Sequence, residues 1–191
     1  FNDSVDKYTT KPVAQAYNKV MPSVLNTGVS NVFSNGSEVT TSVNSVLQGK
    51  VKNAGVSVSR LLVNSTLGMG GLFDVASKLG LESSKEDFSQ TLGVWGVKKG
   101  SYIVLPLMGS TTTRGLLGKG PDYMTSPSRL IDPTSVRDKA SVLGAVNSRA
   151  GLLEAEKMVI GERYDFIRDI YMNQVDVNTH GKALETDDDD F

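Results

Sequence analysis

Apolar residues recur at steps of three and four through most of the chain, the spacing typical of amphipathic helices. The first of these stripes runs from Tyr17 to Val32 and contains Pro22, which predicts a break between two helices. Comparable stripes cover residues 39–47, 51–62, 136–150 and 164–175. Strict alternation of apolar and polar positions is rare outside residues 101–107. The pattern therefore predicts an all-α fold built from short amphipathic helices.

Glycine is concentrated in the middle of the chain. Eleven of the 19 glycines lie between Gly68 and Gly120, a region that also holds the single tryptophan, Trp95. Because glycine permits positive φ angles and close backbone approach, we expect an irregular, tightly packed central segment held between helices. No internal repeat or linker is visible. We therefore predict one domain over residues 1–191, with a core over about 1–175 and a polar, acidic tail over 176–191.

One stretch of this central segment, NSTLGMGGLFDVA at residues 64–76, combines apolar side chains with a single ionisable group. Its glycines, which we expect to let backbone segments pass close together, are Gly68, Gly70 and Gly71. The apolar side chains are expected to face the core or lipid. A carboxylate among such neighbours must be paired or hydrogen-bonded. Asp74 is therefore predicted to be an internal tie that contacts Arg60, Asn64 or a group of backbone amides.

Composition and motifs argue against several classes of function. A net charge of −1 gives no electrostatic reason to expect a nucleic-acid partner. The chain has no cysteine and one histidine, His180, which we expect to be a solvated tail residue rather than a metal ligand. GMGGLFD has Phe73 in place of the third glycine of a dinucleotide-binding loop, and GLLGKGPD has Gly120 where a phosphate-binding loop needs Ser or Thr. We therefore expect no cofactor, no metal site and no catalytic residue.

Two further features of the sequence bear on catalysis and on membrane insertion. The acidic pairs Asp3–Asp6 and Glu86–Asp87 are typical of solvated surface, although paired carboxylates are the enzyme signal that the sequence excludes least. The longest charge-free apolar stretches, residues 61–73 and 101–113, are shorter than the roughly 18 to 20 residues of a membrane-spanning helix. We therefore predict a protein that does not cross a membrane by a conventional helix.

Four blocks of sequence together resemble a known family. They are KPVAQAY (11–17), NSVLQGK (44–50), RLLVNSTLGMGGLFDVA (60–76) and FSQTLGVWGVKKGSYIVLPLMGSTTTRG (88–115). Over about residues 1–150 the chain resembles the MlaA family, also called VacJ, of Gram-negative outer-membrane lipoproteins, and it matches that family loosely beyond. The lipid-modified cysteine that anchors family members would lie upstream of Phe1.

The resemblance implies a compact, mostly helical, ring-like protein in the inner, periplasm-facing leaflet of the outer membrane. Such a protein lets phospholipids misplaced in the outer leaflet pass through an amphipathic channel toward the periplasm, without catalysis, and so maintains lipid asymmetry. Its implied partners are phospholipids, a trimeric porin and a soluble periplasmic lipid-carrier protein. Two acyl chains contain about 30 methylenes, so exposing them to water would cost on the order of 25 kcal/mol. A ring within the leaflet keeps the tails in an apolar setting and offers the charged headgroup a polar path.

The stretch SYIVLPLMGSTTTRG at residues 101–115 is the expected border of that passage, because it places an apolar tip beside a row of hydroxyls. Pro106 and Gly109 disfavour a continuous helix and predict a hairpin. The expected lining residues are Trp95, Leu105, Pro106, Leu107, Met108, Gly109, Ser110, Thr111 and Thr112. We predict that bulky or charged replacement at Leu107 or Gly109 perturbs lipid traffic and leaves the fold intact.

Basic side chains lie beside this tip, and their role is open between two interpretations. Arg114 and Lys119, with Lys98 and Lys99 as further candidates, either contact a lipid phosphate, for which the arginine fork is suited, or are simply solvated.

Two other functions stay open for the whole chain. One is a structural porin-binding adaptor without a channel, and the other is a phospholipid-modifying enzyme, which would need a nucleophile and a base.

Overall fold

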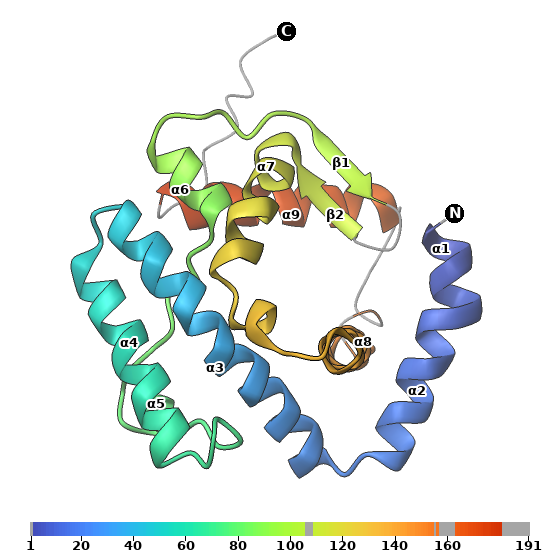
Figure 1. The fold of residues 1–191 in the computed structure, drawn as a ribbon. Helices are drawn as coiled ribbons and strands as arrows, with labels where there is room; N and C mark the ends of the chain where they lie inside the picture. Colours follow the sequence, from blue (N-terminus) through green and yellow to red (C-terminus); the bar gives the residue numbers. More distant parts are fainter. Residues whose placement is uncertain (1, 106–108, 155, 157–162, 181–191) are drawn as a thin grey trace, which may run out of the picture.

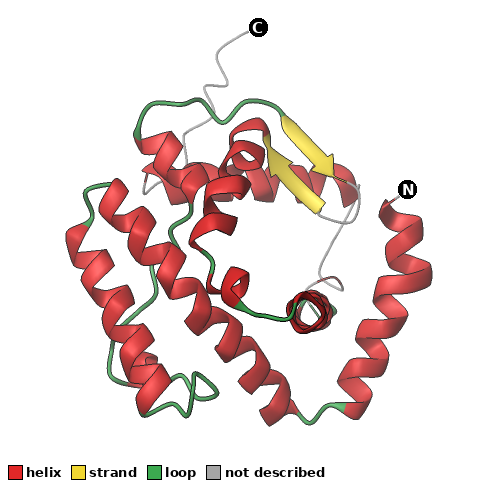
Figure 2. Cartoon of the chain, viewed as in Figure 1, coloured by secondary structure: helices red, strands yellow, loops and turns green. Residues whose placement is uncertain are grey.

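The chain folds mainly into helices. The computed structural model describes residues 2–105, 109–154, 156 and 163–180. The elements, in chain order, are α1 (Asn2–Val5), η1 (Asp6–Thr10), α2 (Lys11–Val20), α3 (Ser23–Leu47), α4 (Val51–Thr66), α5 (Val75–Lys78), α6 (Phe88–Val94), β1 (Tyr102–Leu105), β2 (Gly109–Thr112), α7 (Thr113–Thr125), η2 (Pro127–Leu130), α8 (Thr134–Gly151) and α9 (Arg163–His180). The all-α prediction is confirmed, with one small hairpin added (Figure 2).

Pro22 separates the first two long helices, as predicted. α2 ends at Val20, Met21 adopts an extended conformation, and α3 begins at Ser23. The residue before a proline is disfavoured in the helical region, which explains why the backbone turns there. Figure 1 shows the consequence, since α2 and α3 diverge from this point along different sides of the molecule.

The prediction of short helices is wrong for α3. This helix has 25 residues and joins two stripes that we expected to form separate helices, residues 23–32 and 39–47. Between them Gly36 disfavours helix most, and a single glycine costs about 1 kcal/mol, which tertiary packing overcomes. The C-terminal part of α3 then packs antiparallel against α4 (Figure 1).

α8 lies between α2 and α3. Figure 1 shows this arrangement with α8 viewed along its axis. α2 packs against α8, α6 packs against both α7 and α9, and α3 contacts α6, α7, η2 and α8. Segments that are far apart in sequence are thus held together mainly through α3 and α8.

The glycine-rich centre of the chain contains short helices and one hairpin joined by irregular segments. β1 and β2 pair antiparallel, with Tyr102 opposite Thr112 and Leu105 opposite Gly109, which confirms the predicted hairpin. Three side chains begin the helices of this region by accepting a hydrogen bond from a backbone N–H of the first turn. They are Asp74 for α5, Asp87 for α6 and Thr112 for α7.

The last helix extends further than the sequence analysis expected. α9 continues to His180, so residues 176–180 belong to a helix and not to a polar tail. Asp176 and Thr179 are buried and contact the region around the hairpin. Their polar identity suggested solvent exposure, but each meets a basic partner distant in sequence, which the local pattern cannot reveal. The acidic run at residues 185–191 lies outside the described residues.

The buried residues are mostly polar, and many large apolar side chains are exposed. Among the described residues, the buried hydrophobic ones are Ala14, Ala54, Ala76 and Ala150. Many more buried residues are polar or charged, including Asn35, Glu38, Asn44, Arg60, Asn64 and Arg114. Large apolar side chains instead face outward, and Val20 and Leu130 are 83% and 85% exposed. This inverts the usual arrangement of a water-soluble protein.

Candidate functional site

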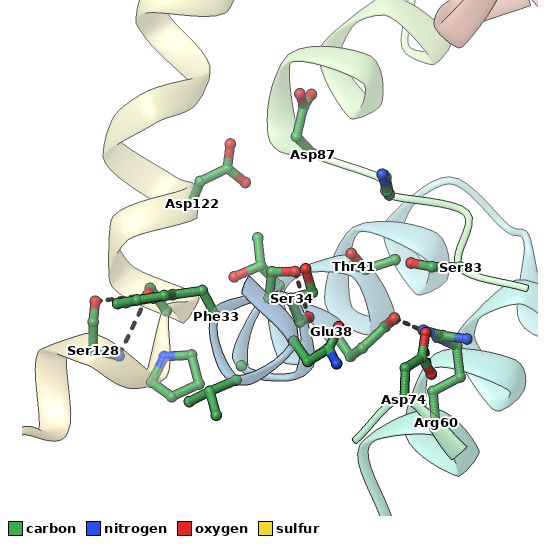
Figure 3. A pocket seen from close by; sticks show the side chains of 18 of the residues that line it. Phe33, Ser34, Glu38, Thr41, Arg60, Asp74, Ser83, Asp87, Asp122 and Ser128 are labelled. Carbon is green, nitrogen blue, oxygen red and sulfur yellow. Dashed lines mark hydrogen bonds and ion pairs between the residues drawn. The ribbon is translucent and has the colours of Figure 1, made fainter. Parts of the chain in front are cut away.

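A large cavity lies between α3, α4, α7, η2 and α8. Its volume is about 1320 Å3. α3 supplies one wall, Arg60 and Asp74 stand on the α4 and α5 side, and residues 82–87 with Asp122 complete it (Figure 3). The serine and threonine side chains that line it are Ser34, Ser37, Thr40, Thr41, Ser77, Ser83, Ser126 and Ser128. Val32, Phe33 and Leu143 add apolar surface, so the cavity offers both polar and apolar walls.

Arg60 is the centre of a buried ionic cluster at one side of this cavity. Its Nε lies 2.6 Å from Glu38 Oε1, and its Nη2 lies 3.3 Å from both carboxylate oxygens of Asp74. Nη1 donates to Ser77 Oγ at 2.9 Å and to the carbonyl oxygen of Leu81. Burial alone would lower the pKa of Arg60, but the two carboxylates raise it above its ordinary value. The guanidinium is therefore permanently charged and fully partnered.

Asp74 has the role that the sequence predicted. Besides Arg60, it accepts hydrogen bonds from Asn64 Nδ2 at 3.1 Å and from the Ser77 backbone N–H at 3.0 Å. Partial burial pulls the pKa of Asp74 upward, but the bonds from Ser77, Asn64 and Arg60 lower it to about 2. Asn64 also accepts from the Ala76 N–H at 2.9 Å and so ties α4 to α5.

The three expected structural glycines shape the loop before Asp74. A Cβ on Gly68 would lie 2.2 Å from the Phe73 carbonyl oxygen, so the loop closes on itself at this residue. Gly70 and Gly71 have φ angles of +72° and +92°, which side chains rarely adopt. Gly71 also lies against Asn35 of α3, where a Cβ would come within 3.0 Å of that side chain. The close approach that the sequence predicted for these glycines is therefore one between this loop and α3.

Two further carboxyl groups face the cavity from its other side. Asp122 of α7 accepts from the Phe88 N–H at 2.9 Å and from Asn44 Nδ2 at 3.0 Å. Asp87 accepts from the Gln90 N–H at 2.8 Å. Burial raises the pKa of both groups. Charge repulsion raises each pKa further, from Glu86 on Asp87 and from Asp87 on Asp122. Both also line a second pocket of about 210 Å3.

The residues expected to line a passage lie on and around the hairpin, apart from the large cavity. Of the described ones, none is among the residues that line that cavity. Thr112 is fully buried and accepts from the Gly115 N–H at 3.0 Å, and Thr111 is buried beside the second pocket. Trp95 is 55% exposed, and its Nε1 donates to the Leu47 carbonyl oxygen at 3.1 Å.

The tip of the hairpin lies mostly outside what the structure describes. Pro106, Leu107 and Met108 fall there, so their part in lining a passage stays a prediction. Leu105 and Ser110 flank the tip and are half-buried, and Gly109 is exposed. Gly109 has a φ angle of +77°, so a side chain at this position would strain the backbone. Replacing it is therefore not the fold-neutral change that we expected.

Arg114 is neither solvated nor presented at the surface. It is 3% exposed, and its guanidinium donates to the Val97 carbonyl oxygen at 3.0 Å and to Thr179 Oγ1 at 2.7 Å. Burial lowers its pKa from the ordinary value. Arg114 thus ties the hairpin region to α9, while Lys119 is exposed at the second pocket. Lys99 pairs with Asp176 at 2.7 Å and Lys98 is exposed.

Sequence reasoning placed only Asp74 among the acidic residues of the large cavity, and the two most buried of the others are Glu38 and Glu86. Glu38 is 1% exposed and is the only charged residue in the 25-residue helix α3, which is a signal that could have singled it out. Glu86 was expected at the solvated surface, but it is 6% exposed and pairs with Lys50 at 2.8 Å. Within the described ranges, no group of three His, Cys, Asp or Glu residues is placed to hold a metal ion.

Apolar side chains cover much of the outer surface. Those on α3, α4 and α8 include Val24, Val46, Leu62 and Val142, each at least 60% exposed. None of the helices in the described part of the chain is both long enough and apolar enough to span a membrane.

Comparison with known proteins finds relatives in several bacteria. A protein of Rickettsia typhi is 41% identical over 116 residues, which cover 61% of this chain and 46% of that protein. The Escherichia coli K12 protein named intermembrane phospholipid transport system lipoprotein MlaA is 33% identical over 192 residues, covering 97% of this chain and 76% of that protein. The chain thus spans about half the length of the rickettsial relatives that it matches.

A solved structure shares the fold. It is described as the structural basis for maintenance of bacterial outer membrane lipid asymmetry, and it aligns with a TM-score of 0.80 and 29% identity over 92% of this chain and 90% of its own. The family model described as MlaA lipoprotein matches residues 1–178. By this match and by its similarity to the E. coli protein, the chain belongs to the MlaA lipoprotein family.

Proposed function

We propose that this chain is a non-enzymatic component of an outer-membrane phospholipid-transport system, which helps to maintain lipid asymmetry. The E. coli and Haemophilus influenzae relatives are named as lipoproteins of an intermembrane phospholipid transport system. The solved structure with the same fold concerns outer-membrane lipid asymmetry. These relatives support the proposal, and the chemistry of the molecule supports it independently.

The observation that carries the proposal is the inverted distribution of polarity. Exposed apolar side chains suit the acyl chains of a membrane leaflet, where they gain about 25 cal/mol per Å2 removed from water. The polar interior would be expensive in such a medium unless its groups were partnered, and the ion cluster at Arg60 supplies partners. A molecule of this kind can reside in a leaflet and keep a hydrophilic space within it.

The large cavity is the proposed polar path. Its hydroxyls and charges can solvate a phospholipid headgroup, and Val32, Phe33 and Leu143 can contact the start of the acyl chains. The headgroup would then leave water without losing polar partners, while the tails stay against apolar surface. In this proposal the path passes beside α3 and residues 82–87, and the hairpin borders it from outside the cavity.

The setting of the protein is part of the same proposal. We place it in the periplasm-facing leaflet of the outer membrane, held by a lipid anchor on a cysteine that precedes Phe1 in the precursor. A trimeric porin and a soluble periplasmic lipid carrier are the proposed partners, as the resemblance to the family implies, and these partners or the lipid gradient set the direction of transport. The family to which the chain belongs supports this setting.

Photo-cross-linking tests the proposal. Protein reconstituted into vesicles is irradiated with a phospholipid that carries a photoactivatable group either in the headgroup or at the end of an acyl chain. We expect the headgroup probe to label α3 and residues 82–87, and the acyl probe to label exposed apolar positions such as Leu62. Equal labelling of the exterior by both probes, with none in the cavity, would contradict a headgroup path.

A separate incubation of the pure protein with phospholipid tests the absence of catalysis. Mass spectrometry of lipid extracted after incubation with the pure protein is expected to show unchanged phospholipid. The appearance of free fatty acid or of a modified headgroup, lost in heat-denatured protein, would instead favour a phospholipid-modifying enzyme.

A further inference from the structure

The basic and acidic residues of this nearly neutral chain lie in different parts of the sequence. Residues 7–73 and 88–121 contain ten of the 20 basic residues but one of the 21 acidic ones. That acidic residue is Glu38, which is 1% exposed and paired with Arg60. The rest of the chain contains the other ten basic residues and 20 acidic ones. Charge divided in this way is typical of proteins that meet an anionic partner with one part of their surface.

The fold brings these two basic stretches together at the turn between α3 and α4. Trp95, just after α6, donates its indole N–H to the Leu47 carbonyl oxygen at 3.1 Å. Next to Leu47, the Nε2 of Gln48 donates to Thr91 Oγ1 of α6, also at 3.1 Å. Figure 1 shows α6 beside the adjoining ends of α3 and α4. We refer to residues 46–52 and 94–98 together as the Trp95 corner.

The Trp95 corner exposes apolar and basic side chains, and its sequence contains no acidic residue. Lys52 and Lys98 are exposed, and neither takes part in a salt bridge within the part of the chain that the structure describes. The exposed large apolar side chains of the corner are Val46, Leu47, Val51, Val94, Trp95 and Val97.

Carboxylates from neighbouring elements do not neutralise these two lysines. Glu86 is buried and pairs with Lys50 at 2.8 Å. Asp176 of α9 is buried and pairs with Lys99 at 2.7 Å. Both carboxylates are therefore occupied by other lysines, and the corner keeps a positive charge beside its apolar side chains.

The apolar surface continues from the corner along α3 and α4. Val43 lies one helical turn before Val46 and Leu47, and Val58 and Leu62 follow Val51 on the same face of α4. An acidic protein bound at the corner would neutralise the lysines but leave this continuation exposed to water. A lipid leaflet covers both, because acyl chains meet the apolar side chains and lipid phosphates meet the ammonium groups.

From this arrangement we infer that the Trp95 corner lies in the headgroup region of a leaflet that contains anionic phospholipid. Trp95 and the valines lie at the boundary with the acyl chains, where tryptophan is enriched in membrane proteins. Lys52 and Lys98 extend to the phosphates and are attracted by the negative charge of the lipid surface. The inference rests on the proposed residence in a leaflet, and it adds the surface that sets the depth of the protein and the lipid charge that this surface prefers.

The fluorescence of Trp95 tests the depth, because it is the only tryptophan in the chain. The full chain is reconstituted into vesicles whose phospholipid carries bromine, a contact quencher, either near the headgroup or at the end of an acyl chain. We expect stronger quenching by the bromine near the headgroup. Stronger quenching by the deep bromine, or no quenching by either, would overturn the inference.

Vesicle sedimentation tests the lysines. Purified protein is mixed with phosphatidylcholine vesicles that contain or lack phosphatidylglycerol, and the bound fraction gives an apparent Kd. We expect tighter binding with phosphatidylglycerol, and this gain should weaken as salt is added. Lys52→Gln with Lys98→Gln is expected to raise the Kd for the anionic vesicles about tenfold and to change the Kd for the neutral vesicles little.

A matched double variant assigns the effect to the corner. Lys78→Gln with Lys139→Gln removes the same charge from exposed positions elsewhere and is expected to leave both Kd values unchanged. Circular dichroism verifies that both variants remain folded. A preference for anionic vesicles that survives in the corner variant, or that is lost equally in the control, would overturn the inference.

Two further outcomes separate the alternatives. Soluble polyglutamate that shifts the emission of Trp95 as much as the anionic vesicles do would assign the corner to an acidic protein and overturn the inference, while the transport proposal would stand. Wild-type protein that binds neither kind of vesicle contradicts the proposed function, and the inference falls with it.

Discussion

At the residue scale, the account depends on buried charges that neutralise one another. Arg60 holds Glu38 and Asp74 together and connects α3, α4 and the start of α5. A buried ion pair is a weak source of net stability, but removing one partner leaves an uncompensated charge. The cluster therefore holds α3, α4 and the start of α5 in fixed positions beside the cavity.

Loss of the Arg60 guanidinium should be severe. We predict that Arg60→Ala lowers the free energy of unfolding by about 3–5 kcal/mol, because two carboxylates lose their shared cation. Arg137, whose nearest carboxylate oxygen on Asp138 lies 3.9 Å away at the surface, is the control, and Arg137→Ala should cost less than about 1 kcal/mol. Urea denaturation measures both, and equal effects would contradict a structural role for the cluster.

The low pKa of Asp74 makes part of the stability depend on pH. A carboxyl group with a pKa of about 2 in the folded protein and 3.8 in the reference state stabilises the fold above about pH 4, and this contribution disappears as the pH falls toward 2. Because Asp74 is partly exposed, we expect about 1 kcal/mol. The difference in unfolding free energy between wild type and Asp74→Asn should shrink over this range, and a constant difference would contradict the assignment.

Gly68, in the loop before Asp74, and Gly55, in α4, give two alanine substitutions with opposite expected effects on stability. Gly68→Ala places a Cβ against two carbonyl oxygens and is expected to destabilise the protein by about 2 kcal/mol or more. Gly55→Ala in exposed α4 meets nothing within 4 Å and should stabilise it by about 0.5–1 kcal/mol. Thermal unfolding of the two variants reads out the opposite signs, and a stable Gly68→Ala protein would show that the loop is not tightly closed.

At the element scale, the sequence predicted the features that depend on neighbouring residues and missed those that depend on contacts between distant residues. Pro22 fixed a helix boundary by its own sterics, and the tip residues Pro106 and Gly109 indicated a hairpin. The continuity of α3 through Gly36 depends on packing against α4, and the burial of Arg114 depends on Thr179, which is 65 residues away. No local pattern carries such pairings, so the site residues were harder to predict than the helices.

The end of α9 supplies a test at this scale. Ending the chain after residue 175 removes Asp176 and Thr179, the partners of Lys99 and Arg114, whereas ending it after residue 180 retains both. We predict that the shorter chain is less stable than the longer by about 2 kcal/mol or more, since a buried guanidinium loses a hydrogen bond. Equal denaturation midpoints would show that these contacts contribute nothing.

At the scale of the whole molecule, the apolar stripes point outward and the polar residues point inward. Periodicity indicated helix in the regions of α2, α3, α4, α8 and α9 but not in those of α6 and α7. An apolar stripe also looks the same in sequence whether it faces a core or a lipid. The small number of buried hydrophobic residues, all of them alanine among those described, decides between the two. The polar interior and the cavity then follow from one arrangement of helices.

Cysteine labelling tests this inverted arrangement most directly, because the chain has no native cysteine. Single variants are reconstituted into phospholipid vesicles and exposed to a water-soluble maleimide, with denatured protein as the reference for full reaction. We predict that Ser34→Cys and Ser83→Cys in the cavity react, and that Leu62→Cys and Leu117→Cys on the apolar exterior are protected by lipid. Reactive exterior positions together with protected cavity positions would contradict the account.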